Sequence, residues 1–121
     1  MKPFELQPTL ENELIRILPL KESDFDTLYK IASDPLIWAQ HPNRDRYKKE
    51  VFQKFFEGAI QSKGAFLVFD NHTNEAIGSS RFYDYDSKKN TVAIGYTFLA
   101  RDHWGTRFNS KLKELMLSHA F

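Results

Sequence analysis

The sequence contains no cysteine, so disulfide bonds, thiolate nucleophiles and cysteine-ligated metal sites are all excluded. It also lacks an excess of either charge. The 17 basic and 16 acidic residues give a net charge of +1, and no overall field favours nucleic acid or a membrane. No apolar run reaches the length of a signal peptide or of a membrane span. We therefore expect a cytoplasmic protein without nucleic-acid or membrane partners, whose site holds no metal ion.

The sequence is nevertheless rich in residues that build a core. Apolar residues make up 41% of the 121 positions, and 11 positions are phenylalanine, which argues against disorder. No internal repeat, low-complexity tract or linker divides the chain. The length therefore predicts a single domain, or slightly less than one, over residues 1–121.

The periodicity of the apolar residues predicts an α+β fold. Alternating or β-branched runs predict strands, and apolar residues at helical spacing predict helices. The expected strands cover residues 14–20, 65–70, 75–84 and 91–99, and the expected helices cover about 24–33, 47–62 and 105–121. The order is strand, helix, helix, three antiparallel strands and helix. Residues 1–12 are expected to form an arm or a short edge strand.

Two local expectations depend on polar side chains. Ser23 is predicted to be the N-cap of the first helix, because its hydroxyl readily accepts hydrogen bonds from backbone N–H groups. The basic stretch 44–49 is offset by neighbouring acids. We expect it to be a solvated helix start, since charged side chains are usually exposed, and a phosphate-binding track is the alternative.

The stretch 91–121 is the most informative part of the chain, because a strand there leads through a short loop into a helix. The first N–H groups of a helix have no helical partner and carry the positive end of its dipole, which suits a phosphate. Gly105 lets the backbone approach a ligand, and the N–H groups of residues 106–109 follow it, those of Thr106, Arg107, Phe108 and Asn109. A single glycine also fits a plain helix start, so both interpretations stay open.

The context of this loop resembles the GCN5-related N-acetyltransferase (GNAT) family. That family has a Gln/Arg-x-x-Gly-x-Gly/Ala motif after its fourth strand, whose backbone amides bind the pyrophosphate of acetyl-coenzyme A. The corresponding residues here are Asp102, His103, Trp104, Gly105, Thr106 and Arg107. The Trp-Gly step and the segments 77–83 and 94–99 are similar to the branch that acetylates ribosomal-protein N-termini. Two positions depart from the motif, which here begins with Asp102 and ends with Arg107.

The resemblance implies a cleft for acetyl-coenzyme A along the last strand and the loop after it. The implied cofactor-binding residues are Phe98, Leu99, Arg101, Trp104, Gly105, Thr106, Arg107 and Asn109. Phe98 and Leu99 would lie beside the thioester, and Arg101 would take over part of the role of the first motif position. Arg107 would either crowd the pyrophosphate or swing outward and add a cation near it. His103 is expected to face solvent or the cofactor phosphates.

The resemblance also implies direct transfer of the acetyl group from the thioester to an amine acceptor, either a small molecule or a peptide. Four strand residues near the expected cleft are candidates for the catalytic or water-holding group, namely Tyr83, Asp84, Tyr96 and Thr97. Of these we assign the role to Tyr83 and Tyr96, and core tyrosines with hydrated hydroxyls are the alternative. Arg81 would orient a carboxylate substrate or bridge Asp84 or Asp86, and we favour the bridge because a buried arginine needs a partner.

The loop between the first two helices forms one wall of the acceptor pocket in related folds. Trp38 and His41 lie in this loop and are therefore the candidates for substrate binding, together with Arg81. The alternative for Trp38 is that it covers the edge of the core from a surface loop. The identity of the acceptor stays open at this point.

The family fold continues with a fifth strand, a fourth helix and a closing hairpin, which these 121 residues do not contain. We thus expect a C-terminally truncated GNAT domain with a GNAT-like mixed sheet, which exposes strand 91–99 as an edge and self-associates through it. The chain would be a fragment, would be completed by a second copy, or would have lost catalysis. The hypothesis is an acetyl-coenzyme A-dependent N-acetyltransferase or its cofactor-binding portion. A non-catalytic module that assembles through the same edge is the alternative.

Overall fold

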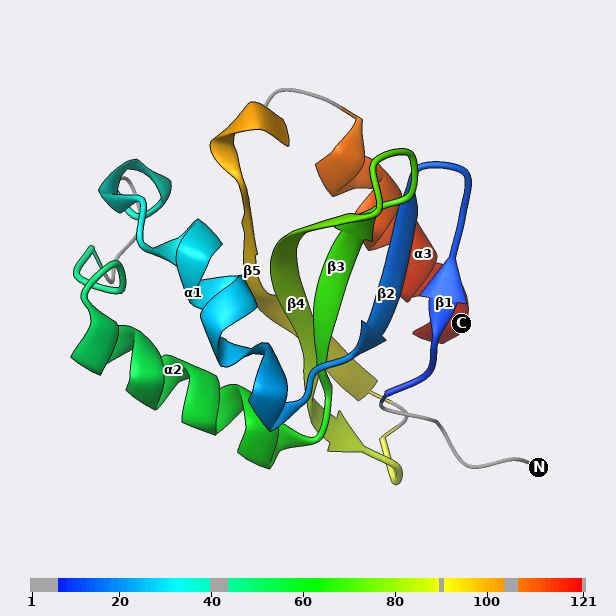
Figure 1. The fold of residues 1–121 in the computed structure, drawn as a ribbon. Coiled ribbons are helices and arrows are strands. Elements are labelled where there is room, and N and C mark those ends of the chain that lie inside the picture. Colours follow the sequence, from blue (N-terminus) through cyan, green and yellow to red (C-terminus); the bar gives the residue numbers. More distant parts are fainter. Residues whose placement is uncertain (1–6, 40–43, 90, 104–106, 121) are drawn as a thin grey trace.

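The computed structural model describes residues 7–39, 44–89, 91–103 and 107–120. These residues form a five-stranded antiparallel sheet in the order β1-β2-β3-β4-β5. Helices α1 and α2 cover one face of the sheet, and α3 covers the other face (Figure 1). The strands are β1 Leu10–Glu11, β2 Ile15–Pro19, β3 Ala65–Asp70, β4 Glu75–Asp86 and β5 Thr91–Leu99. The helices are α1 Phe25–Ala32, α2 Lys49–Ser62 and α3 Phe108–Ala120, with 3₁₀ helices η1 Glu22–Asp24, η2 Pro35–Ile37 and η3 Arg101–His103.

The observed elements confirm the predicted α+β class and the predicted succession of strands and helices. Strands β3 and β5 have the predicted bounds, and α2 ends at the predicted Ser62. Strand β4 continues to Asp86, two residues beyond the prediction. The short strand β1 pairs with β2 at one edge of the sheet, as one of the two expectations for residues 1–12 requires.

The first helix begins differently from the prediction. Its opening turn is the 3₁₀ helix η1, and Lys21 is the residue that precedes this turn as N-cap. The Asp24 carboxylate accepts a hydrogen bond of 2.8 Å from the Lys21 backbone N–H, so a side chain of the turn itself binds the N-cap residue. The predicted N-cap role of Ser23 is therefore wrong, because Ser23 lies within η1.

Two separate hydrophobic cores flank the sheet. The core on the side of α1 and α2 contains Leu20, Leu28, Ala32, Ile37, Trp38, Phe52, Phe56, Ala59, Ala65, Leu67 and Phe98. The core on the side of α3 contains Ile15, Ile17, Phe66, Val68, Ile77, Phe82, Leu99, Leu112 and Met116. Because successive side chains of a strand point to opposite faces, the neighbours Phe98 and Leu99 belong to different cores. The end of β5 is thereby fixed to both layers.

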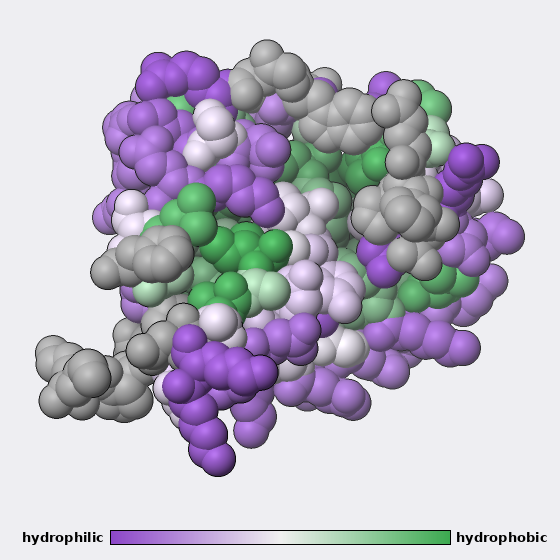
Figure 2. Space-filling view, turned by 180° about the vertical axis from the view of Figure 1, so that it is seen from behind, coloured by the Kyte–Doolittle hydropathy of each residue, from purple (hydrophilic) through white to green (hydrophobic). Residues whose placement is uncertain are grey.

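Strand β5 forms the other edge of the sheet, and β4 is its only neighbour among the strands that the structure describes. The expected edge position is confirmed, whereas self-association through this edge stays a prediction. Seen from behind, hydrophobic side chains remain visible in the middle of the surface, among polar ones (Figure 2).

The described residues contain neither a candidate metal-binding group nor a helix suited to span a membrane. No group of three or more His, Cys, Asp or Glu side chains in this part of the chain is arranged to hold a metal ion. Within the same residues, no helix combines the length and the apolar character that crossing a bilayer requires.

Candidate functional site

A bulge interrupts the pairing of β5 with β4. Ser79 of β4 pairs with Phe98 of β5. The next pair joins Arg81 to Gly95, so one residue of β4 faces two residues of β5 between the pairs. At this bulge Tyr96 has a φ of 53°, in the left-handed region that a bulky residue rarely adopts. Bulges of this kind bend a strand and are frequent beside active sites, which makes this part of β5 the first candidate site.

Six side chains gather beside this bulge, and we term them the arginine–aromatic cluster. Its members are Trp38, Arg46, Phe55, Arg81, Tyr83 and Tyr96. The guanidinium carbon of Arg81 lies 3.8 Å from the centre of the Tyr96 ring and 5.3 Å from the centre of the Phe55 ring. Both distances are within the range of cation–π attraction.

Arg46 and Tyr83 join the cluster through further ring contacts. The guanidinium carbon of Arg46 lies 4.5 Å from the centre of the Phe55 ring and 5.7 Å from that of Trp38. The rings of Tyr83 and Tyr96 meet edge to face, with their centres 5.1 Å apart. The fold therefore unites the four predicted residues Trp38, Arg81, Tyr83 and Tyr96 in one place.

Sequence reasoning missed two members of the cluster. The sequence pattern does not single out Phe55 of α2, and Arg46 lies in the basic stretch that is expected to be solvated. In the structure Arg46 is partly buried, and this burial lowers the pKa of its guanidinium. The expectation of full solvation is therefore wrong for Arg46, because the residues before α2 fold back over aromatic rings.

Arg81 does not form the expected bridge to Asp84 or Asp86. It is 7% exposed, and no ion pair or hydrogen bond within the described residues reaches its guanidinium. Asp86 instead accepts a 2.9 Å hydrogen bond from the backbone N–H of Lys88 in the turn after β4, and Asp84 is exposed. Burial lowers the pKa of Arg81, and the positive charge of Arg46 lowers it further.

Trp38 faces the core. Its side chain is 1% exposed, and its indole N–H donates a 2.8 Å hydrogen bond to the carbonyl of Ala32. Its ring centre lies 5.1 Å from that of Phe98. These contacts favour the alternative in which Trp38 covers the edge of the core. The second predicted residue of this loop, His41, lies outside the described residues.

On the side of α3, a chain of hydrogen bonds supports the bulge. The Nζ of Lys113 donates to Oγ1 of Thr97 at 3.0 Å, and this oxygen lies 2.8 Å from Oγ of Ser80. Ser80 also donates to the carbonyl of Gly95 at 3.4 Å. Burial lowers the pKa of Lys113. The network ties α3 to β4 and β5 where their pairing is irregular.

The predicted cofactor loop is described only at its two ends. Trp104, Gly105 and Thr106 lie outside the described residues. After them, the carbonyl of Arg107 accepts the first helical hydrogen bond of α3, from the N–H of Lys111 at 2.9 Å. The side chains of Arg107 and Asn109 are both exposed at this start of α3. The first turn of the helix is therefore open to solvent on the side of these two residues.

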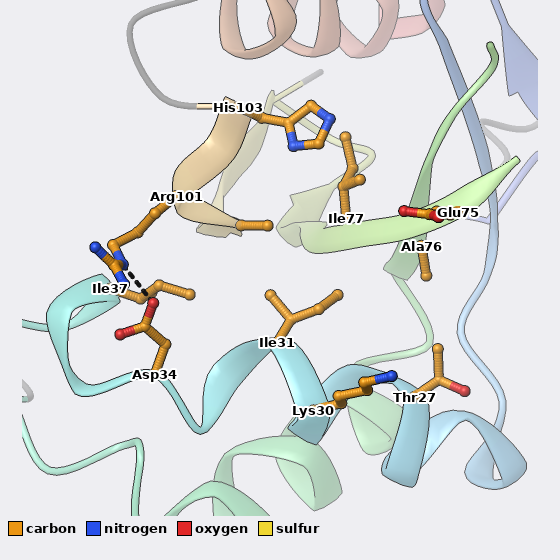
Figure 3. Close-up of a pocket in the computed structure, with 11 residues that line it drawn as sticks. Thr27, Lys30, Ile31, Asp34, Ile37, Glu75, Ala76, Ile77, Arg101 and His103 are labelled. Atoms are coloured by element: carbon orange, nitrogen blue, oxygen red, sulfur yellow. Dashed lines mark hydrogen bonds and ion pairs between the residues drawn. The ribbon is translucent and has the colours of Figure 1, made fainter. Parts of the chain in front are cut away.

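A cavity of about 710 Å³ lies between α1, the start of β4 and η3 (Figure 3). Its lining residues are Thr27, Lys30, Ile31, Asp34, Ile37, Glu75, Ala76, Ile77, Ala100, Arg101 and His103. The Nε of Arg101 donates to Oδ2 of Asp34 and joins η3 to the N-cap of η2. The hydrogen bond from Arg101 holds the pKa of Asp34 below its usual value. Arg101, a predicted cofactor ligand, thus has a carboxylate partner.

His103 turns toward the sheet instead of toward solvent. Its Nε2 lies 3.2 Å from Oδ2 of Asp70, and the imidazole is 18% exposed. The expectation that His103 faces solvent is therefore wrong, because its ring lies against Asp70 at the end of β3. A contact of His103 with the cofactor phosphates stays a prediction. Burial alone would raise the pKa of Asp70. The hydrogen bonds from the His72 N–H, the His103 ring and the Thr73 N–H outweigh burial and hold the pKa below 3.8.

We expect Asp70→Ala to lower the free energy of unfolding at pH 7 by about 2 kcal/mol, because it leaves several hydrogen-bond donors without an acceptor. Since folding lowers the pKa of Asp70, the ionised carboxylate adds to the free energy of unfolding above pH 3.8. This contribution is lost as the pH falls through the folded-state pKa of Asp70. Urea unfolding from pH 7 to pH 3 measures this difference. The exposed control Glu57→Ala should stay within about 0.5 kcal/mol of the parent protein. An equal loss in both variants would contradict the prediction.

Comparison with known proteins identifies the family of this fold. Residues 15–121 match the family model described as the acetyltransferase (GNAT) domain. The chain belongs to the GNAT acetyltransferase family. Membership of the ribosomal-protein branch and truncation of the domain stay predictions.

Individual relatives of this GNAT chain are distant in sequence. The uncharacterized N-acetyltransferase p20 of Bacillus licheniformis is 24% identical over 119 residues, which cover 93% of this chain and 66% of that protein. A crystal structure of a GCN5-related N-acetyltransferase from Brucella melitensis matches with a TM-score of 0.82 at 17% identity, over 98% of this chain and 57% of that one.

A third relative was crystallised with ligands. The spermidine N-acetyltransferase from Vibrio cholerae, in complex with CoA and spermine, matches with a TM-score of 0.65 at 16% identity. The match covers 91% of this GNAT chain and 65% of that protein. The chain thus spans between 57% and 66% of the length of these three relatives.

Proposed function

We propose that this GNAT chain binds acetyl-coenzyme A and serves the transfer of its acetyl group to an amine acceptor. The observation that carries the proposal is the match of residues 15–121 to the GNAT domain, a range that includes the bulged strand β5 and helix α3. Because the chain spans two thirds or less of the relatives' length, the proposal concerns the protein that contains it. None of the comparisons favours a non-catalytic assembly module.

In this proposal the arm of the cofactor that bears the thioester runs along the outer edge of β5, where no described strand pairs with it. The side chains of Phe98 and Leu99 are buried in the two cores, so these residues would meet the cofactor through their backbone. A backbone N–H beside the bulge at Tyr96 would donate to the acetyl carbonyl and stabilise the oxyanion.

The diphosphate of the cofactor would lie at the start of α3. Helical N–H groups that have no carbonyl partner favour an anion there, and the predicted loop residues Trp104, Gly105 and Thr106 precede this turn. The exposed side chain of Arg107 supports the outward alternative, in which it adds a cation instead of crowding the diphosphate. Asn109 in the same turn is equally exposed.

Acetyl transfer forms a bond between the acceptor nitrogen and the thioester carbon and breaks the carbon–sulfur bond. The acceptor ammonium must first lose a proton, and the departing sulfur must gain one. We assign the proton-holding group to the hydroxyls of Tyr83 and Tyr96, because their rings are in contact beside the bulge. The Tyr96 side chain is 42% exposed and therefore accessible to substrate and water.

We expect Asn109→Glu to weaken the binding of acetyl-coenzyme A about tenfold, because it places a negative charge beside the proposed diphosphate site. The helix itself should not be weakened, since acidic residues in the first turn are favourable for the helix dipole. Calorimetric titration with acetyl-coenzyme A measures the affinity, and Asn109→Gln is the neutral control. Equal affinity of the Glu and Gln variants would place the diphosphate elsewhere. Absence of heat with the parent protein at high micromolar cofactor would remove the proposed function itself.

A further inference from the structure

We propose that the arginine–aromatic cluster binds a carboxylate of the acceptor, so that the substrate is an amine that also carries an acidic group. Arg46 and Arg81 are the residues that would contact this carboxylate. The inference rests on the proposed acetyl transfer, because it names the acceptor class for that same site.

Two positive charges lie close together in the cluster. The guanidinium carbons of Arg46 and Arg81 lie 4.5 Å and 5.3 Å from the centre of the same Phe55 ring. Neither guanidinium takes part in an ion pair with any residue that the structure describes. Buried charges in proteins are normally paired. The cluster therefore lacks a negative charge that a ligand would supply.

The surroundings of both arginines disfavour their positive charges. Burial lowers the pKa of both guanidinium groups, and the charge of Arg46 lowers that of Arg81 further. Asp45 raises the pKa of Arg46 in part, but it does not form an ion pair with it. Arginine nevertheless stays protonated at neutral pH. A bound carboxylate would thus relieve an unfavourable arrangement of two positive charges.

Two arginines outside the cluster have polar partners for their side chains. Arg101 has a carboxylate partner in Asp34. Arg16 also lies over an aromatic ring, with its guanidinium carbon 4.9 Å from the centre of the Phe69 ring, yet it donates a hydrogen bond to the side-chain oxygen of Asn74. Arg16 is therefore a matched control for an arginine that packs on a phenylalanine outside the cluster.

The geometry suits a carboxylate in particular. A guanidinium that packs over a ring keeps the N–H groups of its planar edge available, and this fork matches the two oxygens of a carboxylate. Arg81 is 7% exposed, and the ring that covers it belongs to Tyr96, which is itself 42% exposed. An anion that enters beside Tyr96 would lie next to the bulge of β5, where the acetyl group is proposed to be transferred.

The same cluster disfavours a polyamine as the acceptor. The Vibrio cholerae relative is a spermidine N-acetyltransferase, and its structure holds spermine. A polyamine would bring several positive charges to a site that already contains two, and like charges repel. An acidic acceptor, such as a peptide N-terminus followed by an aspartate or glutamate, would instead be attracted.

Binding of succinate to the full-length protein tests the site without any acetyl transfer. In NMR titrations at constant ionic strength, we expect the Nε–H signals of Arg46 and Arg81 to shift, while that of Arg16 does not. Arg46→Gln should weaken succinate binding about tenfold, the range of a charge-assisted hydrogen bond, and Arg16→Gln should leave it unchanged. Arg81→Gln should act like Arg46→Gln where circular dichroism shows that it folds. Absence of shifts, or an equal shift of Arg16, would overturn the inference.

Acetylation of matched acceptors tests the substrate class. We expect kcat/KM to be about tenfold higher for a peptide with glutamate in its second position than for the same peptide with glutamine. The difference should disappear in Arg46→Gln, and spermidine should be a poor acceptor. Equal rates for both peptides, or a preference for spermidine, would overturn the inference and leave acetyl transfer intact. Succinate binding without acetylation of any acceptor would support the anion site and remove the proposed function.

Discussion

Replacement of Gly78 by alanine is expected to lower the free energy of unfolding by about 3 kcal/mol or more, the upper range for overpacking. A Cβ at this position would lie 2.0 Å from the carbonyl oxygen of Phe98 and 3.0 Å from Cα of Leu99. These atoms belong to the backbone of β5 and cannot turn away as a flexible side chain would. The substitution therefore has to push β5 away from β4, which urea unfolding followed by circular dichroism would detect.

The matched control for Gly78 is Gly58 in the middle of α2. A Cβ at Gly58 meets no atom within 4 Å, so Gly58→Ala should raise the free energy of unfolding by about 0.5–1 kcal/mol through helix propensity alone. The two substitutions add the same methyl group with opposite expected signs. A Gly78→Ala protein as stable as the parent would show that β5 does not lie against β4 as described.

Trp38→Ala is expected to lower the free energy of unfolding by about 4 kcal/mol, because it removes a large buried ring from the core. The ring contacts Phe98 and Phe55, and the indole N–H donates to the carbonyl of Ala32. Trp38→Phe keeps most of the apolar volume but leaves that carbonyl without its donor, so the expected loss is about 1–2 kcal/mol. Urea unfolding of the three proteins measures both values.

This pair of variants also decides between the two roles of Trp38. If Trp38 is a packing residue, the free energy of unfolding should be lowest for Trp38→Ala, intermediate for Trp38→Phe and highest for the parent protein. If Trp38 instead binds substrate, both variants should have a raised KM for the acceptor and an unchanged free energy of unfolding. The second outcome would contradict the position of Trp38 in the core.

The sequence was sufficient to predict those elements whose signals are local. The polar turn at 71–74 marks the end of β3, and the polar turn at 86–90 marks the start of β5. The start of the first helix differs from the prediction because the cap is formed by the Asp24 carboxylate and not by the Ser23 hydroxyl. This carboxylate accepts a hydrogen bond from the backbone N–H of Lys21, three residues earlier.

The candidate site was less predictable, because its contacts join distant segments. The bulge at Tyr96 depends on the register between β4 and β5, and the glycine before it was its only local sign. Arg46 looks like any surface cation in the sequence, and only the packing of its segment over Phe55 and Trp38 reveals its environment. The cofactor residues were proposed from family resemblance, and Trp104, Gly105 and Thr106 lie outside the described part.

The ion pair between Arg101 and Asp34 joins the segment after β5 to the segment after α1, and both partners remain in contact with water. Exposed ion pairs add little to stability, since water and salt replace most of the attraction. The carboxylate partner of Arg101 therefore contributes little to the stability of the fold. Breaking this ion pair would remove the side-chain link between η3 and the segment after α1 without a large change in the free energy of unfolding.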